Sequence, residues 1–232
     1  MECFFFQKEN IMKERLSNMT MTFLELHQFM KEDSLLYYRI EKMLPLKWQR
    51  LEKGESRLKD SRQVIIVQQG LLVEMKNEKK LTSYCRMFTD KQLIYSTNGT
   101  MALCALENTR YSVIPADLLF DQLEEQKLLS NLFLQLQEEL ENERNQELLL
   151  QGYSIGEKVE LLLQSLIQKY QLDPKTNPRF PSWVNRQALA GFVNSSVPMA
   201  SRRVKELADK GFIDTKATPW RLLQSLPEAF VR

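Results

Sequence analysis

The chain has 232 residues, of which 43% are hydrophobic, and this is enough for two domains of ordinary size with buried cores. No apolar run approaches the roughly 20 residues that cross a membrane, and no signal sequence is recognisable, so we expect a cytoplasmic protein. The net charge of +2 is unevenly distributed. Nine basic and four acidic residues lie between 176 and 232, whereas nine acidic and two basic residues lie between 113 and 150. The C-terminal end is therefore the one suited to a polyanion.

Residues that serve metal or nucleophilic chemistry are few. The three cysteines, Cys3, Cys85 and Cys104, are too far apart in sequence to suggest a disulfide framework or a four-thiolate metal site. We expect ordinary reduced thiols, with a redox role as the open alternative. His27, the single histidine, lies in a hydrophobic helix-like run and is expected to be structural. No glycine falls in a phosphate-loop spacing, so we expect no enzyme, no metal and no cofactor.

Residues 1 to 50 have the hydrophobic spacing of helices. From Leu51 the pattern changes to short runs separated by turns, which is typical of a small antiparallel barrel. We expect strands within 51–55, 64–75, 81–88, 92–96, 101–106 and 110–115. The helices and a cupin-like antiparallel β-roll would form a sensor-like domain over residues 1–116, and the whole chain is predicted to be of the α+β class.

The segment 117–151 contains neither Pro nor Gly, so we expect one long helix from Asp117 to Leu150. Its hydrophobic stripe is wider than a helix lying on a small barrel needs. A second copy of the helix would cover the surplus and make a homodimer. The alternative is that the stripe packs only on the β-domain of its own chain. The predicted dimer residues are Leu129, Leu132, Phe133, Leu136 and Leu140.

A C-terminal domain is expected over residues 152–232. Gly152 is interpreted as a hinge, and Ser154 can cap the helix that opens the domain. The turn-forming residues from Asp173 to Pro178 should end that helix.

The segment from Asn185 to Ile213 has the pattern of two helices joined by a tight turn. Asn194 stands at the turn, and asparagine is among the few residues that tolerate a left-handed backbone. Ser195 and Ser196 can cap the second helix, whereas Pro198 suits only its first turn. The second helix should therefore begin near residue 197.

The second helix has a small, apolar inward side made of Ala200, Val204 and Leu207. Its outward residues are Met199, Arg202, Arg203 and Lys205, with Arg203 near the edge of the inward stripe. Arginine can bond a guanine edge bidentately or grip phosphate. After Gly211, which should end the helix, the runs 212–215 and 220–223 are expected to form a two-stranded wing.

The order of β-barrel, long helix, hinge and winged helix resembles the Crp/Fnr superfamily of bacterial transcription regulators. The resemblance extends from about residue 51 to residue 230. Four segments carry it, namely Leu51–Glu55, Val64–Gly70, Glu157–Leu163 and 186–213. It implies a homodimeric, sequence-specific regulator that binds double-stranded DNA at a near-palindromic operator. RNA polymerase would be a further partner if the regulator is an activator.

By this resemblance, Arg202 matches a base-reading position, and Asn185, Gln187 and Ser196 match positions that commonly hold phosphates. At two other base-reading positions many members have Arg and Glu, where this chain has Val197 and Pro198. The operator should therefore differ from the common consensus. The full set of predicted DNA-binding residues is Asn185, Arg186, Gln187, Ser195, Ser196, Val197, Met199, Arg202, Arg203, Lys205, Lys216 and Arg221.

Three of these residues could contribute to base recognition in ways that the common family pattern does not include. Val197 and Met199 could contact a thymine methyl group, and Arg203 could share the base or phosphate contact of Arg202. Arg202, with Arg203 as a second candidate, is expected to carry most of the direct readout.

The sensor end differs from the members that bind cyclic nucleotides, which hold the cyclic phosphate with an Arg followed by Ser or Thr. No Arg occurs between Phe88 and Leu106, so the resemblance is to the PrfA-like branch without the nucleotide pocket, and cAMP is not expected as effector. Any small-molecule effector is unknown. The alternative function is a cytosolic small-molecule or thiol-sensing module whose C-terminal domain binds protein rather than DNA.

Overall fold

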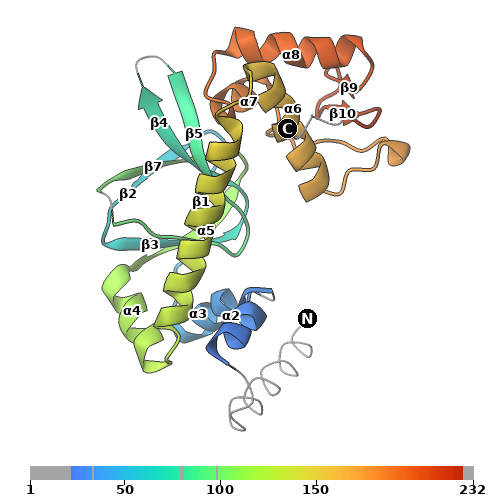
Figure 1. The fold of residues 1–232 in the computed structure, drawn as a ribbon. Helices are drawn as coiled ribbons and strands as arrows, with labels where there is room; N and C mark the ends of the chain where they lie inside the picture. Colours follow the sequence, from blue (N-terminus) through green and yellow to red (C-terminus); the bar gives the residue numbers. More distant parts are fainter. Residues whose placement is uncertain (1–21, 33, 79–80, 98, 227–232) are drawn as a thin grey trace. The chain divides into compact units, whose positions relative to one another are not determined.

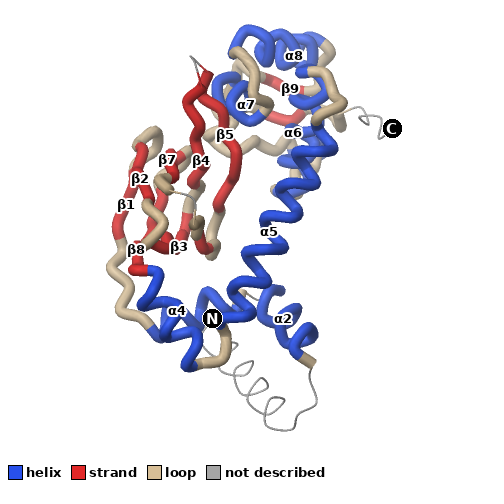
Figure 2. The backbone as a smooth tube through the Cα atoms, turned by 60° about the vertical axis from the view of Figure 1, so that its left-hand side comes forward, coloured by secondary structure: helices blue, strands red, loops and turns tan. Residues whose placement is uncertain are grey.

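The computed structural model describes residues 22–32, 34–78, 81–97 and 99–226, and Cys3 lies outside them. It has helices and antiparallel sheets, as the α+β expectation requires (Figures 1 and 2). Packing divides the chain into two compact units, one from 1–45 and 117–138, the other from 46–116 and 139–232. Each unit groups residues that contact one another in space, whereas each expected domain is one continuous stretch of the sequence. In the described part of the chain, no helix is long and apolar enough to span a membrane.

The first unit is helical. It contains α2 (Phe23–Glu32), α3 (Leu35–Met43), α4 (Ala116–Glu125) and the first turns of α5 (Leu129–Leu150). His27 is buried on α2, and its Nε2 lies 3.3 Å from a carboxylate oxygen of Glu138 on α5. Lys31 Nζ donates to the other oxygen of Glu138 at 2.5 Å. The hydrogen bond from Lys31, supported by His27, lowers the pKa of Glu138.

The prediction of a single helix over 117–150 is wrong, because the chain breaks between α4 and α5. Lys127 adopts a left-handed backbone with φ 57°. The Leu128 amide donates to the Leu123 carbonyl at 2.8 Å, and the Lys127 amide to the Glu124 carbonyl at 2.9 Å. This is the bonding of a Schellman helix end, and the side chains of Leu123 and Leu128 are both buried. Burial of Leu128 offsets the strained backbone, so no glycine marks the break.

Two four-stranded antiparallel sheets make the β part of the second unit, in the orders β1-β8-β3-β6 and β2-β7-β4-β5. The strands are β1 (Gln49–Leu51), β2 (Ser56–Lys59), β3 (Gln63–Gln69), β4 (Leu72–Glu78), β5 (Leu81–Phe88), β6 (Leu93–Ile94), β7 (Met101–Ala105) and β8 (Thr109–Pro115). Alternate side chains from both sheets form one buried core that includes Ile65, Leu72, Phe88 and Leu103. Strand β2 is not among the expected strands.

Gly70 divides the apolar run 64–75 into β3 and β4. Its φ is 111°, and a Cβ there would lie 2.7 Å from the Cα of Thr109 and 2.8 Å from the carbonyl oxygen of Asn108. Both neighbours are backbone atoms, so neither can rotate away. Only glycine therefore fits this turn.

The remainder of the second unit contains α6 (Ile155–Lys169), the 3-10 turn η1 (Pro174–Thr176), α7 (Arg186–Phe192), α8 (Val197–Asp209), β9 (Ile213–Asp214) and β10 (Arg221–Leu222). Strands β9 and β10 pair antiparallel, with Ile213 opposite Leu222. Both lie within the runs expected to form strands.

The local signals at the ends of these helices are confirmed except for the predicted serine cap of α8. Ser154 forms a full capping box with Glu157 at the start of α6. Asn194 has φ 49° at the turn between α7 and α8, and Gly211 has φ 78° after α8. Ser196 does occupy the N-cap of α8, but its side chain makes no capping hydrogen bond. One of the two usual donors is missing there, because Pro198 at the second helical position has no N–H.

The helices share a hydrophobic core with the sheet that contains β4, β5 and β7. Leu71, Val73 and Cys104 from this part are buried together with residues of α6, α7 and α8. The ring of Tyr84 on β5 contacts Phe192 edge-on, with 5.1 Å between ring centroids. Gly191 on α7 is buried against the same tyrosine ring. Helix α7 therefore approaches β5 closely at a position without a side chain.

Gly191→Ala is expected to lower the free energy of unfolding by about 1–3 kcal/mol. A Cβ at this position would lie 2.7 Å from a ring carbon of Tyr84, so the ring or the helix must move. The better helix propensity of alanine, about 1 kcal/mol, acts in the opposite direction. Urea unfolding measures the balance, and adding Tyr84→Ala should remove the clash from the glycine substitution. A stabilised single variant would contradict the tight contact.

Lys127→Gly is expected to raise the free energy of unfolding by about 0.5–1 kcal/mol, because glycine adopts the left-handed backbone without a Cβ penalty. Arg144→Gly, within α5, is the matched control and should lower the free energy of unfolding by about 1 kcal/mol. Equal destabilisation of both variants in thermal unfolding would mean that the two helices are continuous at residue 127.

Candidate nucleic-acid interface

Helix α8 has one buried and one exposed side. Ala200, Val204 and Leu207 are buried on its inward side, which confirms the predicted stripe. These small and branched side chains allow α8 to pack closely on α6 and α7. The orientation of the helix about its own axis is therefore set by the core.

Four predicted contact residues share the exposed side of α8. Val197 and Met199 stand out as large apolar side chains in solvent, and Arg202 and Lys205 are exposed beside them. Solvent-exposed apolar side chains at the start of a basic helix are suited to a partner that offers both methyl groups and negative charge.

The start of α7 supplies a second group of polar residues. Asn185 is the N-cap of α7: its Oδ1 accepts from the Ala188 amide at 2.9 Å, and its Nδ2 donates to the Trp183 carbonyl at 3.1 Å. Arg186 and Gln187 follow it with exposed side chains. The Asn185 side chain thus has a structural role in capping, which was not among the roles predicted for it.

Three other predicted residues differ in how far they reach the surface. Ser195 is buried, and its Oγ donates to the Ser196 carbonyl at 3.3 Å. Arg221 on β10 is half-buried, whereas Lys216 is exposed in the turn between β9 and β10. Ser195 consequently lacks the exposure that a phosphate contact needs.

Arg203 lies in a different environment from its neighbour Arg202. It forms an ion pair with Glu160, a buried residue on α6, and its Nη1 donates to Glu206 Oε2 at 2.6 Å. Burial opposes the charge of Arg203, but the hydrogen bonds that it donates to Glu206 and Glu160 outweigh this effect and raise its pKa. Glu160 was not among the predicted site residues, and its only signal was an acidic residue directly after Val159 in an apolar helix stripe.

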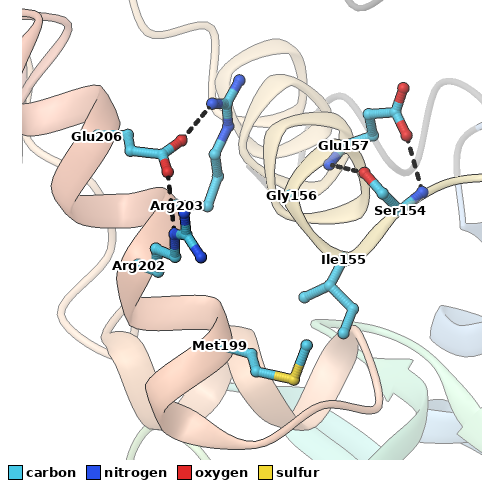
Figure 3. Close-up of a pocket in the computed structure, with 8 residues that line it drawn as sticks. All are labelled: Ser154, Ile155, Gly156, Glu157, Met199, Arg202, Arg203 and Glu206. Carbon is cyan, nitrogen blue, oxygen red and sulfur yellow. Dashed lines mark hydrogen bonds and ion pairs between the residues drawn. The ribbon is translucent and has the colours of Figure 1, made fainter.

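One flank of α8, with Met199, Arg202, Arg203 and Glu206, faces the first turn of α6 across an open groove of about 560 Å³ (Figure 3). Arg202 and Arg203 approach the two oxygens of Glu206 on one wall, and Ser154 and Glu157 form the capping box on the other. The hydrogen bond from Arg203 lowers the pKa of Glu206, so its carboxylate is charged at neutral pH. The groove lining comprises Ser154, Ile155, Gly156, Glu157, Met199, Arg202, Arg203 and Glu206.

The predicted dimer stripe on α5 divides into two parts. Leu132 and Leu136 are buried within the single chain, and Leu129 is half-buried, so they do not form an open seam. Phe133 and Leu140 are exposed. Leu148, which was not predicted, is a further exposed apolar residue near the end of the same helix.

The cysteines within the described residues are not poised for reaction. Cys104 is buried and Cys85 is half-buried, and neither is disulfide-bonded. Burial raises the pKa of the Cys85 thiol, which lowers the fraction of reactive thiolate. No group of three or more metal-binding side chains occurs in the part of the chain that the structure describes.

No protein-family model and no curated protein matches the sequence, but many solved structures match the fold. FixK2 from Bradyrhizobium japonicum is 14% identical with a TM-score of 0.64, covering 78% of this chain and 94% of that one. The c-di-GMP-responsive global regulator CLP from Xanthomonas campestris is 16% identical with a TM-score of 0.63, covering 84% and 100%. A CRP/FNR-family transcriptional regulator from Thermus thermophilus is 16% identical with a TM-score of 0.60, covering 77% and 94%. The chain therefore has the fold of Crp/Fnr transcription regulators, as its sequence segments predicted.

Proposed function

We propose that the chain is a cytoplasmic, sequence-specific DNA-binding transcription regulator of the Crp/Fnr type, which acts as a homodimer on a near-palindromic operator. The observation that carries this proposal is the exposed side of α8, where Val197, Met199, Arg202 and Lys205 stand together above a buried apolar side. The helix has 13 residues, or about 20 Å, and the major groove is about 12 Å wide. Its N-terminal half can therefore enter the groove.

In this proposal α7, α8 and the β9–β10 hairpin act as a winged helix-turn-helix. Arg186 and Gln187 at the start of α7 and Ser196 at the N-cap of α8 would hold phosphates, together with Asn185 where its capping role allows. Lys216 in the hairpin turn would contact the DNA backbone beside the groove. Arg221 would contribute less to this contact, because it is half-buried. Such contacts set the register of the protein on DNA and add salt dependence.

In this proposal Arg202 makes most of the direct contacts with DNA bases. Its guanidinium can bond the O6 and N7 atoms of a guanine, while Val197 and Met199 can contact thymine methyl groups. We assign Arg203 a structural role in holding α8 against α6, since its guanidinium already forms ion pairs with Glu160 and Glu206. Ser195 does not belong to the proposed contact set, because it is buried.

The dimer in this proposal uses the exposed face of α5. Phe133 and Leu140 remain from the predicted stripe and Leu148 is added to them, whereas Leu132 and Leu136 are buried within one chain. Two recognition helices related by a two-fold axis would then address half-sites one helical turn apart, about 34 Å.

The other function considered is a small-molecule or thiol-sensing module whose C-terminal domain binds protein. Selection of bound fragments from genomic DNA separates the two functions. A recovered site with two-fold symmetry supports the regulator, whereas binding no tighter than to bulk DNA, with and without cell extract, contradicts it. Cell extract supplies any soluble effector, so the selection identifies the operator even when that effector has not been identified.

Arg202→Ala is expected to weaken binding to the selected site by about 1–3 kcal/mol, or roughly 5- to 150-fold, and binding to scrambled DNA far less. The reason is that a base contact carries sequence information and a phosphate contact does not. Fluorescence anisotropy titrations at two salt concentrations measure both losses. Arg62→Ala, an exposed arginine in the turn between β2 and β3, is the matched control and should leave both affinities unchanged. Equal losses of affinity on both DNAs would mean that Arg202 contacts a phosphate and not a base.

Leu140→Glu is expected to weaken self-association by about tenfold or more, because it places a charge in an apolar seam that a second α5 would bury. Sedimentation velocity over a concentration series measures the change. Leu58→Glu makes the same substitution at an exposed leucine on β2 and should leave association unchanged. A monomeric wild-type protein, or an equal effect of both variants, would contradict the α5 dimer.

A further inference from the structure

Four side chains of alternating charge form a continuous series from α6 to the outward side of α8. Glu160 contacts Arg203, Arg203 contacts Glu206, and Glu206 Oε1 lies 3.5 Å from Arg202 Nε. Exposure of the side chains increases along the series from 7% through 25% and 42% to 86%. The series therefore begins in the core and ends at the residue that we propose reads DNA.

The buried end holds the series in place. A buried carboxylate without a partner is strongly unfavourable, so Glu160 restrains Arg203 in one position. Arg203 in turn donates its Nη1 hydrogen bond to Glu206 at 2.6 Å. Glu206 is thus held on one side by a restrained cation, unlike a carboxylate in an ordinary exposed ion pair between residues four apart.

The contact geometry leaves part of Arg202 available. Glu206 lies near Nε of Arg202, so the two Nη nitrogens at the end of the guanidinium can still form a bidentate contact with a base. The same carboxylate repels a phosphate that approaches Arg202 but exerts much less force on a neutral guanine edge. Figure 3 shows Glu206 between the two arginines on the wall of the groove.

We propose that Glu206 determines specificity by positioning Arg202 for a base edge and by weakening its attraction to phosphate. This inference rests on the proposed function. Glu160 and Arg203 are positioning residues that hold Glu206. Glu206 is therefore required for selective binding, although it adds a negative charge to a DNA-binding helix.

The test compares Glu206→Gln with Asp209→Asn on the selected operator and on scrambled DNA. Both variants remove one negative charge from α8, and Asp209 is exposed on the same helix. Glu206→Gln should bind scrambled DNA about 3- to 10-fold more tightly and lower the ratio of specific to non-specific affinity by about the same factor. Asp209→Asn should change both affinities equally and leave the ratio unaltered. Glu206→Asp, which keeps the charge but shortens the side chain, should lower the ratio as well.

A double-mutant cycle then asks whether Glu206 acts through Arg202. In an Arg202→Ala background, Glu206→Gln should shift the affinity ratio no more than Asp209→Asn does. A wild-type protein with no preference for any DNA contradicts the proposed function and this inference together. A selective wild-type protein in which Glu206→Gln and Asp209→Asn change the ratio alike contradicts this inference alone. This inference alone is also contradicted if Glu206→Gln changes the affinity ratio as much in the Arg202→Ala background as it does in the wild-type protein.

Discussion

The ring of Tyr84 on β5 occupies the space that a side chain at position 191 of α7 would need. This close approach joins the β part of the second unit to α7, and α7 in turn packs against α8. Protein interiors are packed as densely as organic crystals, so the orientation of α8 depends on this contact and on the core around it. The exposed side of α8 is what remains after its small apolar side has been buried.

Electrostatics adds a second constraint on the same helix. Glu160 is buried on α6, and its charge needs a cation, which Arg203 supplies. Successive residues of a helix are rotated by about 100°, so turning Arg203 toward α6 turns Arg202 toward solvent. Packing and charge therefore favour the same rotation of α8. The two adjacent arginines consequently have different environments and, in our proposal, different roles.

Sequence patterns predicted the features that depend on a few neighbouring residues. The cap at Ser154, the left-handed turn at Asn194 and the end of α8 at Gly211 were all predicted, because caps and left-handed residues act within one helical turn. The inward stripe of α8 was predicted from its 3.6-residue period. The break at Lys127 was not, since a lysine adopts that backbone there only because Leu128 is buried.

Residue patterns, together with the family resemblance that they carry, predicted the fold of the Crp/Fnr regulators but missed strand β2 and the break between α4 and α5. They also assigned DNA binding to the segment 185–213, which stays a prediction. Which residues of that segment are available could be read only from the folded chain. Ser195 is buried, Leu132 and Leu136 are covered within one chain, and Arg203 is paired with a residue 43 positions away. Hydrophobic period and helix capping are local in sequence, whereas exposure and ion pairing depend on what lies across the core.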